Sequence, residues 1–438
     1  MMRKCLVLVT LAFLAMLTAS IARGQVPSSP VDISSSVSES KHPAIAMGPG
    51  GDIHVVWEGW TSASWEILYS SKPVGGVWTS PVNISNTGGA SNRPAIAVGE
   101  DGSLHVVWHD EASGAWDILY ASRAPGGSWS AATNISNNAG WSFQPEIVVG
   151  GDGSLHVVWH DHTSGNRQIL YASKPVDGPW SPPTQVWSNG GTSSFPALAV
   201  GEDGYLHLVW EERTPDNWEI LYATRPPGGS WASPENVSGS VRKSRRPGLA
   251  VAGDGSPHVV WQGEAEGNLR LYYAARGQAG SWSSAADISE DVLTSTRSAI
   301  VVAKDGSLYA AWVGNGSGAG DILFAGKPPG GFWTPAVNIS SSDGASGEPA
   351  LAVGEDGSPH VVWHDNTLGS NHVFYASPST ALAATPPPAP AQTLPQSEVG
   401  GSGGGLSRAL LTLALAGAGG AVLAGGLLVV ARRRLGSR

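Results

Sequence analysis

Cysteine is nearly absent from this chain of 438 residues, and the only one, Cys5, lies close to the N-terminus. Residues 1–24 carry Arg3 and Lys4, then the apolar run CLVLVTLAFLAML, and they end in ARG before Gln25. A basic start followed by an apolar stretch and a polar end is typical of a secretory signal peptide. Cleavage of the leader would remove the only cysteine, so the exported domain could form no disulfide. Packing alone must then stabilise it.

Charged side chains are also scarce, at 14% of the residues, and the formal net charge is −10. A net acidic balance argues against nucleic acid as a partner. The apolar spacing that marks amphipathic helices is missing from the body of the chain. Glycine and proline are abundant instead, with 58 and 31 residues, and this composition favours a turn-rich, all-β protein.

A tryptophan recurs at a fixed interval of 51 residues. It ends each run of the type HVVW, and its positions are Trp57, Trp108, Trp159, Trp210, Trp261, Trp312 and Trp363. The copies are close, as GEDGSLHVVWHDEASGAWDILYAS (99–122) and GGDGSLHVVWHDHTSGNRQILYAS (150–173) show. A period near 50 residues indicates supersecondary units that bury their apolar faces only against their neighbours.

Each repeat contains the pattern of four short strands. PAIAVGEDGSLHVVWHD (94–110) is two β-rich runs around a turn at Asp101-Gly102, DILYASR is a third strand, and SWSAATNIS, opened by Trp129, is a fourth. Four strands of five to seven residues, joined by Gly and Pro turns, predict a propeller blade. We therefore expect an all-β fold, a seven-bladed β-propeller.

The two ends of the array predict how the ring closes. The seventh copy stops after HVFYAS (372–377) and lacks its fourth strand, whereas PVDIS (30–34) matches PVNIS (81–85) at a distance of 51 residues. We expect the N-terminal strand to complete blade seven and leave no open sheet edge at the seam. The propeller is assigned to residues 25–380.

The C-terminal part of the chain differs in composition. Residues 381–408 are rich in Pro and then in Gly, which predicts an unfolded linker. Residues 409–431 carry no charge and would be about 35 Å long as a helix, enough to span a bilayer, with the basic tail 432–438 in the cytoplasm. This pattern predicts a single-pass membrane anchor and an extracellular propeller. The alternative is a C-terminal sorting signal, since LPQSE is distantly similar to a sortase site.

The turn between the third and fourth strands of the repeats resembles the Asp-box (BNR) turn of the sialidase-like β-propellers. That turn reads Ser-x-Asp-x-Gly-x-x-Trp, and SKPVGGVW supplies Ser71, Gly75 and Trp78 at those spacings. The Asp itself is replaced, by Pro73, Ala124, Pro175, Pro226, Gly277 and Pro328. The resemblance covers residues 30–377 as architecture, although family members mostly have six blades.

The resemblance implies which face of the ring binds a ligand. In that family the Asp-box turns lie opposite the active site, so the connections between second and third strands, and those between repeats, would form the ligand face. Sialidases use a Tyr nucleophile paired to a Glu, an Asp acid/base, and three arginines that hold the substrate carboxylate. Six of the nine tyrosines here recur at one third-strand position, and none of the other three falls in a ligand-face loop. This distribution argues against sialidase chemistry.

Non-repeating residues concentrate on the expected ligand face of blades 2 to 4. The residues that follow the recurring Trp vary between blades, and some blades add a further Trp eight residues after it. Tryptophan beside carboxylate and imidazole is a usual arrangement for sugar binding, because the ring stacks and the polar groups bond to hydroxyls. The alternative is that these tryptophans cover the blade tops. The predicted ligand-binding residues are His109, Asp110, Trp116, His160, Asp161, Glu211, Glu212 and Trp218.

Three arginines, Arg93, Arg246 and Arg297, occupy one position just before the first strand of blades 2, 5 and 6. They predict either an anion-binding site at the inner rim of the ligand face or a solvated rim. By contrast, we expect the recurring histidine of LHVVW to pack blade on blade and not to bind a metal, and no cofactor is expected. The other four blades hold His42, Gln144, Phe195 and Glu348 at the arginine position.

Two functions remain open at this point. In the first, the chain is a non-catalytic surface receptor or adhesin whose propeller binds a glycan or a protein. In the second, it is a sialidase-like glycoside hydrolase that uses a carboxylate pair about 5 Å or about 6.5 to 9.5 Å apart. Carboxylates dispersed blade by blade would favour binding. The candidates for the pair are Asp110, Asp161, Glu211, Glu212 and Asp365.

Overall fold

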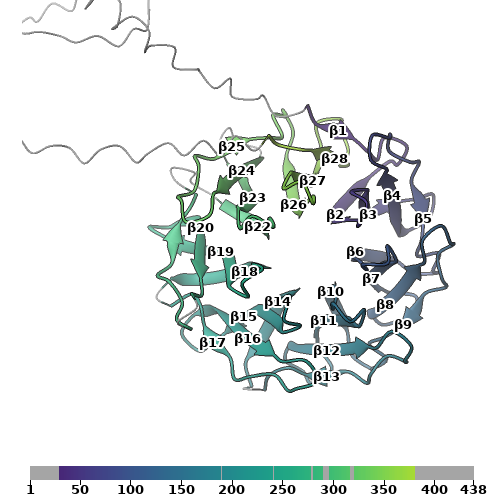
Figure 1. Ribbon diagram of the computed structural model, residues 1–438. Coiled ribbons are helices and arrows are strands. Elements are labelled where there is room, and N and C mark those ends of the chain that lie inside the picture. Colours follow the sequence, from purple (N-terminus) through teal and green to yellow (C-terminus); the bar gives the residue numbers. More distant parts are fainter. Residues whose placement is uncertain are drawn as a thin grey trace, which may run out of the picture. The chain divides into compact units, whose positions relative to one another are not determined.

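The computed structural model describes residues 29–379, apart from 189, 240, 278–279, 290–294 and 316–319. Within this part of the chain, 28 strands form seven four-stranded sheets. The sheets stand as blades around a central opening, with the first strand of each repeat nearest the centre (Figure 1). The predicted seven-bladed propeller is confirmed.

The strands of a blade follow one another outward, and we call them inner, second, third and outer. The inner strands are β2 (Ser40–Met47), β6 (Ser91–Val98), β10 (Ser142–Val149), β14 (Thr192–Val200), β18 (Arg242–Val251), β22 (Ser295–Val302) and β26 (Ser346–Val353). The second strands are β3 (Ile53–Trp60), β7 (Leu104–Asp110), β11 (Leu155–Asp161), β15 (Leu206–Arg213), β19 (Pro257–Ala265), β23 (Leu308–Gly314) and β27 (Pro359–Asp365).

The outer half of each blade is shorter. The third strands are β4 (Trp65–Lys72), β8 (Asp117–Arg123), β12 (Gln168–Lys174), β16 (Trp218–Arg225), β20 (Asn268–Ala275), β24 (Asp321–Lys327) and β28 (His372–Ala376). The outer strands are β5 (Val82–Asn83), β9 (Thr133–Asn134), β13 (Thr184–Gln185), β17 (Glu235–Asn236), β21 (Ala286–Asp287), β25 (Val337–Asn338) and, from the N-terminus, β1 (Val31–Asp32).

The prediction that the outer strand opens at Trp129 is wrong, because β9 begins only at Thr133 and has two residues. The ring of Trp129 lies edge-on against Tyr69 of the preceding blade, with ring centroids 5.3 Å apart. This tryptophan therefore links two blades instead of extending its own sheet. The same contact recurs in the pairs Trp78–Tyr375, Trp180–Tyr120, Trp231–Tyr171, Trp282–Tyr222 and Trp333–Tyr273.

The recurring second-strand tryptophans are buried at the contacts between blades. Each of the seven hydrophobic clusters in the described residues draws side chains from two adjacent blades. The cluster around Trp108 of blade 2, for example, includes Val56 and Ile67 of blade 1. A blade alone would expose these apolar faces to water, so the blades stabilise one another.

The recurring histidine, which was expected to pack blade on blade, forms its hydrogen bonds within its own blade. His105 Nδ1 lies 2.8 Å from the Tyr120 hydroxyl, and His105 Nε2 lies 2.9 Å from Ser103 Oγ. Ser103 in turn donates to Asp101 of the Asp-Gly turn at 2.6 Å. The turn that is repeated most faithfully is therefore part of the scaffold.

The N-terminal strand closes the ring, which confirms the prediction. Val31 lies opposite Tyr375 and Asp32 lies opposite Phe374 in the pairing of β1 with β28. Ile33 donates its N–H to the carbonyl of Val373 at 2.9 Å and is buried in the cluster that holds Trp57.

The predicted signal peptide (1–24), linker (381–408), membrane helix (409–431) and basic tail (432–438) lie outside the described residues. Across the described part of the chain, no helix has the length and apolar character needed to cross a membrane. These four assignments stay predictions.

Removal of residues 25–36, which include β1, should lower the melting temperature by roughly 5 °C or more. The reason is that β28 would lose its paired edge and the seam would lose the buried side chain of Ile33. Circular dichroism during heating measures the change. A chain that lacks only residues 25–28 is the control, and equal melting of the two would contradict closure by β1.

Candidate functional site

Every inner strand contains a bulge near its start. In β6 the pairing with β7 skips between Asn92 and Ala95, and all seven blades show the same irregularity. The residue in the bulge has a positive φ in each blade although none is glycine. We call these seven residues the channel ring: His42, Arg93, Gln144, Phe195, Arg246, Arg297 and Glu348.

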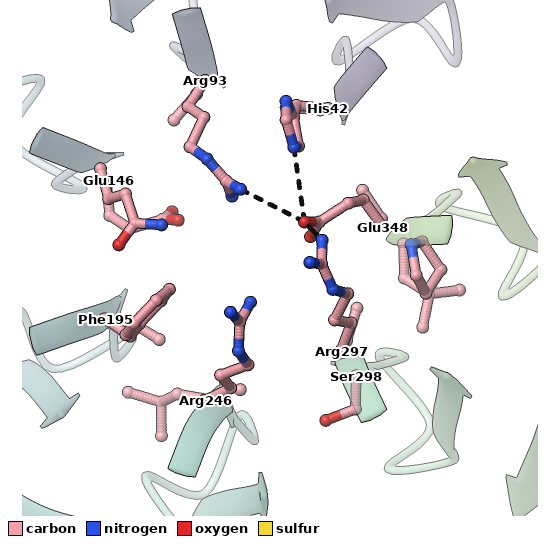
Figure 2. Close-up of a pocket in the computed structure, with 18 of the residues that line it drawn as sticks. His42, Arg93, Glu146, Phe195, Arg246, Arg297, Ser298 and Glu348 are labelled. Atoms are coloured by element: carbon pink, nitrogen blue, oxygen red, sulfur yellow. Dashed lines mark hydrogen bonds and ion pairs between the residues drawn. The ribbon is translucent and has the colours of Figure 1, made fainter. Parts of the chain in front are cut away.

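A left-handed backbone is unfavourable for a residue with a side chain, and bulges commonly turn a side chain in a new direction. The φ values of the channel ring lie between 48° and 53°. Figure 2 shows the labelled ring members pointing from separate blades toward one central cavity. The repeated strain therefore turns one side chain per blade toward the axis of the propeller.

The cavity has a volume of about 360 Å³, within the range of small-molecule sites. It opens at the end of the blades where the second strands finish, because Ser91 at the start of β6 pairs with Asp110 at the end of β7. This is the face that was predicted to bind a ligand. The structure thus brings together the three predicted arginines from β6, β18 and β22.

Two of the three guanidiniums share a single carboxylate of the channel ring. Arg93 Nη2 lies 3.4 Å from Glu348 Oε1, and Arg297 forms an ion pair with the same oxygen. Arg246 makes no ion pair through its side chain within the described part of the chain; its guanidinium lies 4.5 Å from the centroid of the Phe195 ring. Positive charge therefore exceeds negative charge within the channel ring (Figure 2).

The ionisation of the channel ring reflects this crowding. Burial, and after it repulsion from Arg246 and Arg93, lowers the pKa of Arg297 to about 10. Burial and then Arg93 lower the pKa of Arg246 in the same way. Burial also lowers the pKa of His42, which makes its imidazole neutral at pH 7. The arginines stay charged at neutral pH, so an anion between them would relieve their mutual repulsion.

One carboxylate, that of Glu146, enters the cavity from the layer beneath the channel ring. Pro145 and Ile147 on either side of it are buried, whereas Glu146 is exposed to the lumen. Among the described residues its side chain has no hydrogen-bond or ion-pair partner. Enclosure by the channel wall raises its pKa to about 7. The other six blades hold Ala44, Ala95, Ala197, Gly248, Ala299 and Ala350 at this position.

In three blades, the residue directly after the recurring Trp contacts the backbone N–H of the bulge residue in the next blade. Glu58 accepts the N–H of Arg93 at 3.0 Å, and Glu211 accepts the N–H of Arg246 at 3.0 Å. His109 Nδ1 lies 3.5 Å from the N–H of Gln144, the weakest of the three contacts. Glu211 and His109, predicted as ligand contacts, are thus buried supports of the channel ring. In the next blade His160, also buried, packs beside Phe195 of the ring.

The carboxylate one residue further on is bonded inside its own blade. Asp110 accepts hydrogen bonds from Ser91 Oγ at 2.6 Å, Trp108 Nε1 at 3.1 Å and the N–H of Ala112 at 2.8 Å. Glycine replaces it in blade 1, where Ser40 Oγ is left without a bond partner. The equivalent pairs are Ser142–Asp161, Ser193–Glu212 and Ser346–Asp365.

The acidic residues that were predicted as ligand contacts, or as candidates for a catalytic pair, lie inside the scaffold. Asp110, Asp161, Glu211, Glu212 and Asp365 are each at most 2% exposed. Each belongs to a different contact network within or between blades, because the strand ends need acceptors for their buried donors. No open carboxylate pair arises from these five residues.

The predicted tryptophans are half-buried. Trp116 stands edge-on to His109 at 5.1 Å, and the Arg245 guanidinium lies 4.3 Å from the Trp218 ring. Trp141, in contrast, is 56% exposed and begins a path of aromatic contacts that reaches the channel ring. The path runs from Trp141 through Phe143 and His160 to Phe195, with centroids 5.7 to 6.4 Å apart.

Glu146 and Trp141 were not predicted. The repeat contains a signal for Glu146, because a carboxylate there replaces the Ala or Gly of the other six copies, and a comparison of the repeats position by position along the inner strand would have found it. Trp141 gives no such signal, because its position is variable and holds Glu39, Ala90, Thr192 and Lys243 in other blades. Within the described residues no three His, Cys, Asp or Glu side chains group closely enough to hold a metal ion.

No protein-family model matches the chain, and no curated protein matches it in sequence. Solved structures do match its fold. A polysaccharide lyase PL25, an ulvan lyase bound to -[GlcA(1-4)Rha3S]-, has a TM-score of 0.59 at 11% identity, over 79% of this chain and 94% of that one.

Two further matches have other printed descriptions. A protein of unknown function from Dyadobacter fermentans has a TM-score of 0.53 at 12% identity, over 81% of this chain and 99% of that one. A fungal alcohol oxidase of the AA5 family, in complex with copper, has a TM-score of 0.54 at 14% identity, over 81% and 76%. The predicted resemblance to the sialidase-like propellers is thus confirmed as a likeness of fold alone.

Replacement of Asp110 by Ala should lower the free energy of unfolding by about 2–4 kcal/mol, because the buried donors of Ser91 and Trp108 lose their acceptor. Denaturant titration followed by fluorescence measures the loss. Glu111→Ala, which removes an exposed carboxylate one residue away, is the matched control and should leave stability unchanged. Equal stability of the two variants would show that Asp110 is not a structural acceptor.

Proposed function

We propose that the propeller is a non-catalytic module that binds an anionic carbohydrate, with the acid group of the ligand held by the channel ring. The observation that carries this proposal is the Arg246 guanidinium, which faces the cavity and, among the described residues, has no ion pair of its own, beside two arginines that share Glu348. Guanidinium groups bind carboxylates and sulfates through paired, charge-assisted hydrogen bonds. A partly enclosed position strengthens such bonds relative to water.

The aromatic path supports a carbohydrate as the partner. It joins the exposed ring of Trp141 to Phe195 at the edge of the cavity. A flat ring beside polar donors suits a sugar, whose C–H face stacks while its hydroxyls form hydrogen bonds. The ulvan lyase of similar fold was solved with an acidic sugar chain, -[GlcA(1-4)Rha3S]-, which favours this partner over an acidic protein segment.

The hydrolase alternative has little support from the site. A catalytic acid or base must reach the reacting atoms, and the five acidic candidates are buried and hydrogen-bonded or ion-paired within the scaffold. The recurring tyrosines have their hydroxyls on the histidines of the second strands, as in the pair of His156 and Tyr171 at 2.7 Å. They belong to the scaffold and are no free nucleophiles for a ligand.

Arg246→Ala should weaken the binding of an acidic oligosaccharide at least roughly tenfold, since a charged hydrogen bond contributes about 1.5–3 kcal/mol. Isothermal titration of the exported domain with oligosaccharides of glucuronic acid measures the change. Arg242→Ala, on the same strand but exposed, is the control and should bind as the unaltered protein does. An equal loss of affinity in both variants would show that the net charge of the domain, and not the position of Arg246, determines binding, and would contradict the proposed site.

We further propose that the chain is exported and stays on the outer surface of the cell through residues 409–431. The support is the composition of these residues and of the leader at 1–24. In a host that recognises the leader, the full chain should sediment with membranes until detergent is added, whereas a chain that ends at residue 408 should be secreted. Full-length protein in the medium would contradict the anchor. Material that resists detergent and is linked to the cell wall would instead indicate processing of a sorting signal.

A further inference from the structure

We infer that Glu146 makes the channel selective for a sugar acid, by accepting hydrogen bonds from ligand hydroxyl groups while it repels anions that carry no such donor. The inference rests on the proposed function, because it assumes that the acid group lies among the arginines. It adds the chemical class that the site prefers, namely a carboxylate with hydroxyl groups on neighbouring carbons.

The position of Glu146 in the repeat argues that packing does not require a carboxylate there. Six blades place Ala or Gly at this position of the inner strand, and their bulges form in the same way. Glu146 resumes the regular pairing directly after the bulge, opposite Val158 of β11. A long acidic side chain is therefore an addition to the channel and not a part of the blade.

The surroundings of Glu146 leave its oxygens available to a ligand. It points into the cavity across from Arg297 and Glu348 (Figure 2), is exposed to the lumen, and has no bond partner among the described residues. The nearby cations do not neutralise it, since Arg93 and Arg297 pair with Glu348 and Arg246 lies over Phe195. The cavity thus offers a cluster of donors in the channel ring and, in the layer beneath it, an acceptor without a donor among the described residues.

Those two features together select for one kind of ligand. A simple anion gains the arginines but meets the negative charge of Glu146, which repels it. A sugar acid gains the same arginines, and its hydroxyls can donate to the carboxylate, which turns the repulsive group into a hydrogen-bond acceptor. A site discriminates strongly between two ligands when one of them leaves a polar group of the site without a hydrogen-bond partner and the other supplies that partner.

The test compares glucuronate with acetate on the exported domain, by isothermal titration at pH 8. The unaltered protein should prefer glucuronate. Glu146→Ala, which restores the residue of the other blades and so should fold, is expected to bind acetate roughly threefold to tenfold more tightly and glucuronate more weakly. Glu146→Gln keeps an acceptor without the charge and should retain part of the preference. Glu100→Ala removes an exposed carboxylate of a turn between inner and second strands and is the control.

The affinity for acetate should also depend on pH in the unaltered protein. Glu146 loses its charge as the pH falls from 8 to 6, because its pKa is raised to about 7, so acetate should bind more tightly at pH 6. The other ionisable groups that face the cavity are the three arginines, which stay charged, the ion-paired Glu348, and His42, whose pKa burial lowers and which pairs with Glu58. In Glu146→Ala the affinity for acetate should change less between pH 8 and pH 6 than in the unaltered protein.

The outcomes separate the two proposals. Equal changes for acetate and glucuronate in Glu146→Ala, or no change in either, would overturn the role of Glu146 and leave the arginine site standing if Arg246→Ala weakens both ligands. Failure of the unaltered protein to bind acetate or glucuronate at all would overturn both.

Discussion

The burial of each tryptophan-centred cluster between two blades is the constraint on which the rest of the structure depends. No blade contains a complete core, so every blade needs a neighbour on both sides. A row of such units would expose an apolar face at each end, and a ring removes both ends at once. The two residues of β1 that pair with β28 matter out of proportion to their length, since they complete the last of these contacts.

A closed ring of seven blades leaves a channel, and the bulges decide what faces it. The N–H of the bulge residue is held by the neighbouring blade where an acceptor stands after the recurring Trp, as with Glu58 and Glu211. The bulge forms equally with Val313 at that position, ahead of Glu348. The backbone geometry is therefore largely independent of the side chain it displays. Such a scaffold can change its ligand by replacing ring side chains without changing the contacts between blades.

The sequence was most informative where one physical requirement recurs in every blade. The period of 51 residues, the missing last strand and the packing histidines all follow from repeated burial, and repetition makes such a requirement visible in a single chain. The start of the outer strand was mispredicted because Trp129 packs on the neighbouring blade, a contact that local β-propensity does not contain.

The candidate site was harder to predict for a different reason. Variation between blades pointed to Asp110 and its equivalents. The structure shows that this position holds a buried acceptor in some blades and glycine in others, and that glycine leaves the opposite serine hydroxyl of blade 1 without a partner. The three arginines were found because they share one repeat position. Their convergence could not be derived, since it depends on a bulge with positive φ at non-glycine residues. Side-chain direction in a regular strand would have placed neighbouring residues on alternate faces.

Charge is distributed unequally between the two layers of the channel, and this difference would orient a bound ligand. The upper layer holds three arginines and Glu348, whereas the lower layer is small and apolar except for Glu146. Were Glu146 placed to neutralise the arginines, it would lie within bonding distance of one of them, as Glu348 does. Its separation from them preserves both a site for an anion above and an acceptor below. A ligand that satisfies both must carry its acid group at one end and hydroxyl donors beside it, and it would enter with the acid group uppermost and the donors deeper in the channel.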